Sequence, residues 1–235
     1  MEKIAYKLWK NNSESLGQFK AFLLQDLVKT LQSQVIELQV NIADDDVKSA
    51  LQLAQSSYPA SPDAVVSIKV ASSYYSENIM EYLQTASRKV EGFIVSESVI
   101  LHDESKDQEG QRSEGFSQIV FLEKPENMSS FDWFDHWTHH HTKIAIETQS
   151  NFTYIQNTIV RPLQESSPRF IAIIEECFPS GAMSDPSIFY NAQGNIELLS
   201  KNIEVMMDSC KQFIDFTKIE VIPTSRYRMI ESNKI

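Results

Sequence analysis

The sequence is poor in glycine, with six in 235 residues, and it contains none of the common nucleotide-binding or hydrolase motifs. Neither GxGxxG nor a P-loop occurs, and GxSxG and HExxH are also missing. With so few glycines, little of the chain is suited to a loop that cradles a phosphate. The composition therefore argues against a nucleotide-dependent mechanism.

Cysteine, basic residues and long apolar runs are scarce as well. Cys177 and Cys210 match neither a CxxC pair nor a zinc-ligand spacing, and so few thiols suit a reducing compartment. The net charge is -11, which argues against a nucleic-acid backbone or an anionic membrane as a partner. No apolar run approaches the length of a transmembrane helix, and the N-terminus lacks the apolar core of a signal peptide. We expect a cytoplasmic protein.

Two series of predicted elements follow each other in the same order. In the first series, strand patterns alternate with helix patterns over residues 3–10, about 13–31, 35–42, 64–70, about 76–89 and 93–101. In the second, the strands cover residues 118–123, 152–160, 169–178 and 217–222, with one helix after the first strand and helices within 186–214. Both series read β-α-β-β-α-β, which predicts an α+β protein.

The sequence also predicts where one series ends and the next begins. Residues 103–115 are polar and charged and contain two glycines, a composition typical of a solvated linker. We therefore expect a first repeat over residues 1–102 and a second over 116–235. The first helices of the two series support an internal duplication, because four residues recur with spacings of three, three and four at a constant offset of 115: Leu16, Phe19, Phe22 and Asp26, then Phe131, Phe134, Trp137 and His141.

The helix that begins near Ser129 carries four of the five histidines. Ser129 is a plausible N-cap, and His141 falls on the same face as the bulky apolar residues, so its side chain should point inward. His136 and His140 are four residues apart on the opposite, solvated face, among acidic residues. We expect Asp–His pairs that support the helix there, and no metal site.

The residues Trp137-x-x-x-His141, followed by Tyr154-Ile-Gln-Asn157 at the start of the next strand, resemble the signature of the EthD family of dimeric α/β-barrel proteins. The first repeat lacks the corresponding Trp and His. The resemblance implies two ferredoxin-like βαββαβ repeats, which would form an intramolecular dimeric α/β barrel as a pseudo-dimer. This pseudo-dimer could pair further as a homodimer.

The same resemblance suggests a pocket in the second repeat that binds a small molecule. His141 could take and return a proton, although a buried core histidine is the plainer reading. Tyr154 could steady an oxyanion, and Asp26 on an apolar stripe could be a pocket acid or base. Trp137 and Phe22 would shape the wall. Asn157 is a further candidate for substrate binding, although its strand parity is opposite to that of Tyr154.

Three functions fit these expectations. The first is a cofactor-independent cyclase, isomerase or lyase that acts on a small, largely apolar carbonyl compound by His-mediated proton transfer. The second, suggested by the wider superfamily, is a haem-dependent or oxygen-using oxidoreductase. The third is a non-catalytic protein that binds a ligand or an assembly partner.

Overall fold

Eight strands close into an antiparallel barrel in the computed structural model, which describes residues 1–231. Their order around the barrel is β2-β4-β1-β5-β7-β8-β6-β9, and β9 pairs back onto β2. A short strand, β3, adds to the outside of β9. The strands are β1 (Glu2–Trp9), β2 (Glu37–Ile42), β3 (Gln55–Ser56), β4 (Ala64–Val70), β5 (Lys89–His102), β6 (Phe116–Glu123), β7 (Thr153–Pro162), β8 (Phe170–Phe178) and β9 (Ile219–Ile230).

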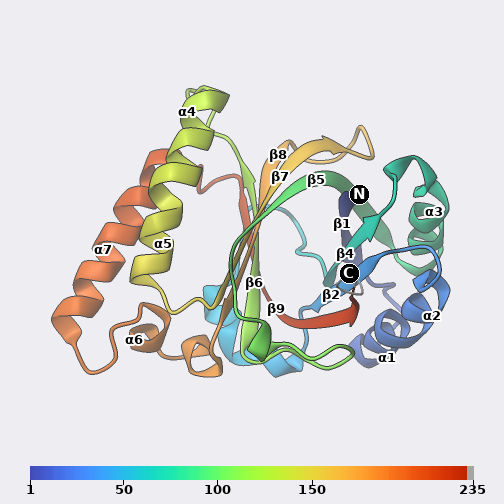
Figure 1. Ribbon diagram of the computed structural model, residues 1–235, viewed down its shortest axis with the longest axis horizontal. Helices are drawn as coiled ribbons and strands as arrows, with labels where there is room; N and C mark the ends of the chain where they lie inside the picture. Colours follow the sequence, from blue (N-terminus) through green and yellow to red (C-terminus); the bar gives the residue numbers. More distant parts are fainter. Residues whose placement is uncertain (232–235) are drawn as a thin grey trace.

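Helices cover the barrel on two opposite sides, α1 to α3 on one and α4, α5 and α7 on the other (Figure 1). The α-helices are α1 (Leu16–Ala21), α2 (Leu27–Leu31), α3 (Glu77–Ala86), α4 (Ser130–Asp135), α5 (Thr142–Thr148), α6 (Pro186–Phe189) and α7 (Ile196–Phe213). Two π-helical turns, η1 (Phe22–Asp26) and η5 (His136–His141), join α1 to α2 and α4 to α5. The 3-10 turns are η2 (Asp45–Leu53), η3 (Ser73–Tyr75), η4 (Glu104–Lys106) and η6 (Ser180–Met183).

The strands of the two halves of the chain lie in corresponding orders. Within residues 1–102 the order is β2-β4-β1-β5, and within the later half it is β7-β8-β6-β9. In both halves the second strand is followed by the third, the first and the fourth. The pairs β5–β7 and β9–β2 join the halves and close the barrel. The predicted α+β class and the barrel are confirmed.

The alternation of side chains along the strands produces three apolar layers. One layer packs between the first-half sheet and its helices, around Tyr6, Leu23 and Leu27. A second packs between the later sheet and its helices, around Trp133 and Trp137. The third fills the barrel itself with side chains from both halves. The barrel is therefore a packed core, and the space between sheet and helices is a separate compartment in each half.

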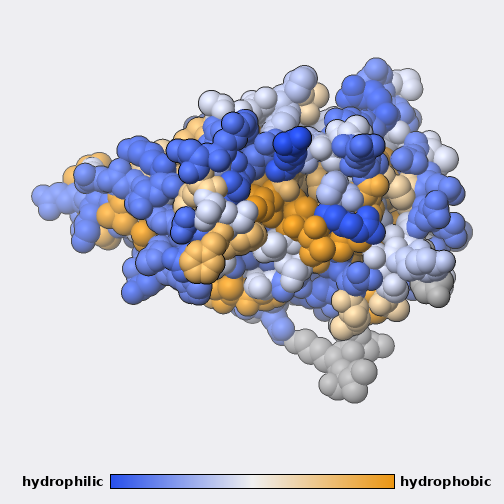
Figure 2. Space-filling model, turned by 90° about the horizontal axis from the view of Figure 1, so that it is seen from above, coloured by the Kyte–Doolittle hydropathy of each residue, from blue (hydrophilic) through white to orange (hydrophobic). Residues whose placement is uncertain are grey.

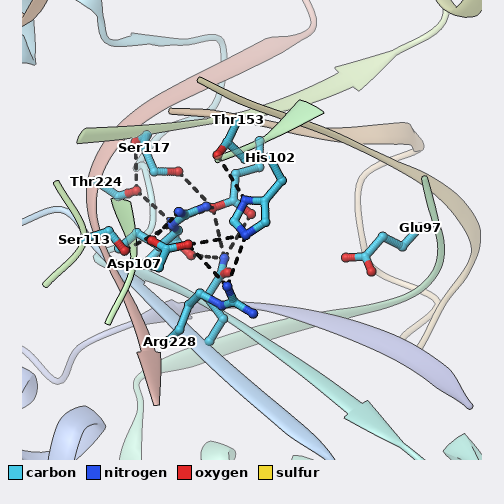
Figure 3. A network of polar contacts seen from close by, with 12 residues as sticks. Glu97, His102, Asp107, Ser113, Ser117, Thr153, Thr224 and Arg228 are labelled. Atoms are coloured by element: carbon cyan, nitrogen blue, oxygen red, sulfur yellow. Dashed lines mark hydrogen bonds and ion pairs between the residues drawn. The ribbon is translucent and has the colours of Figure 1, made fainter. Parts of the chain in front are cut away.

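The connection between the halves, predicted as a solvated linker, is largely exposed but is packed against the barrel at a few positions. Asp107 lies in this segment, and its side chain is only 2% exposed. It binds Arg228 of β9, as Figure 3 shows, and also Arg226 of the same strand. Gly110 donates a backbone hydrogen bond to the carbonyl of Arg228. The polar composition of residues 103–115 thus serves internal ion pairs as well as solvent.

The buried residues of the first helices in the two halves match at an offset of 114 residues and not at the predicted offset of 115. The buried residues follow steps of four in both helices: Phe19, Leu23, Leu27 and Leu31, then Trp133, Trp137, His141 and Ala145. Each helix contains a π-helical turn, which adds a residue to that turn and brings every fourth residue to one face. His141 therefore corresponds to Leu27, and its neighbour Asp26 is exposed.

The surface carries some apolar side chains among hydrophilic ones. Seen from above, apolar residues gather in the middle of the face and hydrophilic residues surround them (Figure 2). On the joining strands β5 and β7 the exposed apolar residues are Val99, Ile100 and Val160. None of the helices in the described part of the chain has both the length and the apolar character needed to cross a lipid bilayer.

Candidate functional site

A cavity of about 240 Å³ lies in the later half, between the sheet and the helices η5 and α7. Its walls are largely apolar, with Trp137, Ile174, Met206 and Phe213 among them. The polar residues that line it are Gln118, His141, Gln149, Tyr154, Glu176 and Tyr190. Leu53 and Gln55 of the first half also reach this cavity, so both halves contribute to it. A largely apolar pocket with a few convergent polar groups is typical of a small-molecule site.

Local sequence fixes the helix that carries His141. The Ser129 hydroxyl accepts a hydrogen bond from the backbone N–H of Asp132 at 3.0 Å, which caps α4 as predicted. Trp133 and Trp137 are buried against the sheet one turn apart and hold the helix to the core. The predicted stripe was wrong at its start, because Phe131 is 80% exposed.

Replacing Ser129 with alanine should destabilise the protein by about 1 kcal/mol, because the first turn of α4 loses its capping acceptor. Urea unfolding followed by circular dichroism measures the change. Ser130→Ala is the matched control, since Ser130 is exposed in the same turn and its hydroxyl caps nothing. Equal unfolding free energies for the two variants would contradict the capping role.

The π-helical turn at His136–His141 is secured by hydrogen bonds on its inner side. Both the backbone N–H and the hydroxyl of Thr142 donate to the carbonyl of Trp137, the hydroxyl at 2.7 Å. The side-chain amide of Gln156 on β7 donates to the same hydroxyl at 2.6 Å. Such turns are often found at functional sites, and this one brings His141 onto the buried face.

His141 is held as a neutral imidazole. Its side chain is buried, with its ring 4.6 Å from that of Phe213, and its Nδ1 lies 3.0 Å from the Ser209 hydroxyl. Burial lowers the pKa of His141 to about 4, and the nearby His136 adds to this effect. His136 Nε2 lies 3.2 Å from the carbonyl oxygen of Ser209, which can only accept, so this nitrogen carries a proton.

The Ser209 hydroxyl therefore links two histidines. If it donates to His141 Nδ1, the neutral ring carries its proton on Nε2, and that nitrogen becomes a donor. This assignment follows from the hydrogen-bond pattern around Ser209. It makes His141 a fixed, uncharged hydrogen-bond donor at the cavity wall.

Tyr154 and Glu176 face the cavity from adjacent strands. They are direct register partners on β7 and β8. Tyr154 is fully buried, and burial raises the pKa of its hydroxyl well above the ordinary value. Burial also raises the pKa of Glu176 to about 7, and a hydrogen bond from Asn151 Nδ2 at 3.3 Å opposes this shift only in part. A carboxyl group that titrates near neutrality in a cavity is a candidate for proton transfer.

The other histidines of the helix do not take part in the cavity. His139 Nδ1 and His140 Nε2 lie 3.0 and 3.6 Å from Asp135, on an exposed face. Within residues 1–231, no group of three or more His, Cys, Asp or Glu side chains has an arrangement that could hold a metal ion. The expected pair of Asp135 with His139 is present, whereas His136, expected on the solvated face, is part-buried against Ser209 and Phe213 of α7.

The structure brings three of the six predicted site residues together. His141, Tyr154 and Trp137 line the same cavity.

The other three predicted residues lie elsewhere, which corrects those predictions. Asp26 is exposed because the π-helical turn places Leu27 on the buried face in its stead. Phe22 packs in the first half, with its ring 6.0 Å from that of Tyr82. Asn157 donates to the carbonyl of Ile173 on the barrel side of β7, because no bulge between it and Tyr154 reverses the strand parity.

Sequence reasoning missed Glu176, which lines the cavity, and Ser209, which contacts His141. Glu176 stands beside Glu175 in the otherwise apolar strand Phe170–Phe178, and two charges in such a strand are a signal that sequence reasoning could have used. Ser209 gave no such signal, because a serine in an amphipathic helix usually faces solvent. Its contact with His141 depends on how α7 packs against η5.

Comparison with known proteins agrees with this description. Residues 125–217, which include the whole His141 helix, match the family model of the EthD domain. The predicted resemblance is confirmed over that range. No curated protein matches the chain by sequence.

Two solved structures share the fold. One is an anthrone oxidase-like protein with a TM-score of 0.54 and 7% identity, over 99% of this chain and 94% of that one. The other is a proposed monooxygenase from Fusobacterium nucleatum with a TM-score of 0.52 and 8% identity, over the same shares of the two chains. At such low identity these similarities support the barrel fold alone.

Proposed function

We propose that this protein is a cofactor-independent enzyme that moves a proton next to the carbonyl group of a small, largely apolar compound. The observation that carries the proposal is the mostly apolar cavity around the neutral His141, which lies on the helix within the segment that matches the EthD domain. Its volume of about 240 Å³ suits a compact organic molecule, and its few polar groups can orient one carbonyl oxygen.

In this proposal His141 polarises the carbonyl group. With Ser209 engaged at Nδ1, the Nε2 proton of His141 is free to be donated to a substrate oxygen that becomes negative as the neighbouring C–H bond breaks. An imidazole with a pKa of about 4 is a weak base, so donation of a hydrogen bond is the role its environment favours. Trp137 provides wall area beside Tyr154.

A second candidate function is an oxygen-using oxidoreductase. It is favoured by the names of the two structural neighbours, an anthrone oxidase-like protein and a proposed monooxygenase. Both candidates begin with the same loss of a proton, because the electron-rich enolate that results can either be reprotonated or react with O₂. The product therefore separates them.

Anthrone is a suitable probe, since it is an apolar aromatic ketone whose methylene hydrogens are made acidic by conjugation of the methylene carbon with the carbonyl group. NMR in D₂O measures exchange of its methylene protons, and an oxygen electrode measures its oxidation. Exchange without oxygen uptake supports proton transfer alone, and uptake supports the oxidoreductase. A Soret band in the purified protein would instead support the haem-dependent alternative.

Replacing His141 with alanine should reduce the anthrone reaction by about 100-fold, because a preorganised donor to the developing oxyanion is lost. His140→Ala is the matched control, since His140 lies on the exposed face of the same helix turn. Circular dichroism verifies that both variants fold. A His141→Ala protein that is as active as the control would contradict the role given to His141.

We further propose that the barrel consists of two ferredoxin-like repeats, of which only the later one keeps a functional pocket. The matching strand orders, the two π-helical turns and the offset of 114 support this proposal. In the first repeat Leu27 occupies the position of His141 within an apolar layer.

A further inference from the structure

We propose that Glu176, and not His141, is the group that takes and returns the proton in the cavity. This inference rests on the proposed function and adds a catalytic residue to it. It starts from the position of Glu176 in β8, where the side chain turns toward the helices and lines the cavity.

Glu176 has little that would hold it as a structural carboxylate. Its one hydrogen bond comes from Asn151 Nδ2, and at 3.3 Å this bond is long. The titratable groups that the structure places around it are Tyr154 on β7, Tyr190 after α6, Cys210 on α7 and His141 on η5. None of these four side chains is cationic near neutral pH. A buried carboxylate without a cation is costly and is seldom retained for stability.

The adjacent Glu175 shows the contrast. It points to the other face of β8, into the barrel, and accepts hydrogen bonds from Gln39, Ser117 and Asn41, with Arg226 at 3.7 Å. Those partners account for Glu175 as part of the core. Glu176 has no comparable set of partners, so a structural role does not explain why a carboxyl group is buried at this position.

The pKa values of His141 and Glu176 are shifted in opposite directions. Burial lowers the pKa of His141 to about 4 and raises the pKa of Glu176 to about 7. At neutral pH the imidazole is therefore uncharged, whereas the carboxyl group is divided between its two forms. Since the best proton-transfer group titrates near the working pH, the carboxyl group is better suited to act as the base.

The step is balanced as follows. The Glu176 carboxylate accepts a proton from the carbon next to the carbonyl group, or in anthrone from the methylene carbon conjugated with it. The C–H electron pair passes into the enolate, whose oxygen receives the hydrogen bond from His141 Nε2. The neutral carboxylic acid then returns the proton, to the same carbon or to another position of the enolate. No metal ion or redox partner is needed for this cycle.

The test compares Glu176→Gln with Glu175→Gln, a neighbour on the opposite face of the same strand. In wild-type protein, anthrone proton exchange should increase with pH around an apparent pKa near 7. Glu176→Gln should lose this pH dependence and about 100-fold of the rate, whereas Glu175→Gln should keep the pH profile. A Glu176→Gln protein with the wild-type rate and profile would overturn the inference, and the proposed function would still stand.

Infrared spectroscopy provides a readout that needs no substrate. A protonated carboxyl band should disappear as pH rises through about 7 in wild-type protein and in Glu175→Gln, and it should be absent from Glu176→Gln. If wild-type protein leaves anthrone unchanged, the proposed function fails for this class of ketone. The infrared titration still measures the protonation state of Glu176. A Glu176 carboxyl group that stays ionised from pH 5 to 8 would overturn the inference.

Discussion

Replacing Arg226 with methionine is expected to destabilise the barrel by about 3 to 5 kcal/mol, because it leaves buried carboxylates without their cation. The Arg226 side chain is 1% exposed. Its NH2 lies 2.5 Å from Asp107 of the connecting segment, and its NH1 lies 3.7 Å from Glu175 of β8 (Figure 3). Burial tends to raise the pKa of Asp107, but the charges of Arg226 and Arg228 and the hydrogen bonds from Ser113 and Arg226 together outweigh it, and the pKa is lowered. Urea unfolding measures the loss.

Arg228→Met is the matched control for this prediction. Arg228 lies two residues further along β9 and also binds Asp107, at 3.3 Å, but its side chain is 27% exposed. A partly exposed ion pair contributes about 1 kcal/mol or less, so this variant should remain close to wild type. If the two variants lose equal stability, Arg226 does not fasten the connecting segment to the barrel.

Much of the fold could be predicted because the strands and helices follow clear apolar periods. The strand patterns over 64–70 and 169–178 match β4 and β8 within one residue. The prediction for the last strand, 217–222, was too short, because β9 runs from Ile219 to Ile230. Its second part contains Arg226 and Arg228, and charged residues resemble an exposed tail unless their buried partners are known. Those partners come from distant segments, and a local pattern contains no such information.

The sequence predicted those site residues that lie close together along the chain, and it missed those that are brought together only by the packing of distant elements. Trp137 and His141 are four residues apart on one helix, and Tyr154 begins the next strand, so the sequence brings them together. Asp26 was misassigned because a π-helical turn cannot be seen in an apolar pattern, which assumes a regular helix. Glu176 was missed because the two faces of β8 are both buried. Only the fold shows which of the two glutamates faces the cavity.

The two tuned groups of the cavity should make stability depend on pH in opposite ways. For Glu176, the ordinary pKa of 4.5 is raised to about 7 in the folded state, so the folded protein binds more protons between these values and loses stability as pH rises through them. For His141, the ordinary pKa of 6.5 is lowered to about 4, so stability is lost as pH falls through this range. Between about pH 4.5 and 6.5 the two effects nearly cancel in wild-type protein.

Glu176→Gln should therefore be more stable than wild type above pH 7, by about 3 kcal/mol, and nearly equal to it at pH 4.5. Urea unfolding at a series of pH values measures the difference between the two proteins, in which the effects of all other acidic residues cancel. Glu175→Gln is the control, and it should lose stability, because the hydrogen bonds to its carboxylate are disturbed.

His141→Gln should give the opposite pH trend. Apart from a constant loss of packing, its stability relative to wild type should improve as pH falls from about 6.5 to 4, because the protonation penalty of the buried imidazole is gone.

The outcome for Glu176→Gln also bears on the role of the carboxyl group. If the unfolding free energies of Glu176→Gln and wild type depend on pH in the same way, the carboxylate is already stabilised by its surroundings in the folded protein. A stabilising Glu176→Gln exchange that also abolishes proton transfer would instead mean that the chain keeps this carboxyl group for its chemistry, at the expense of stability.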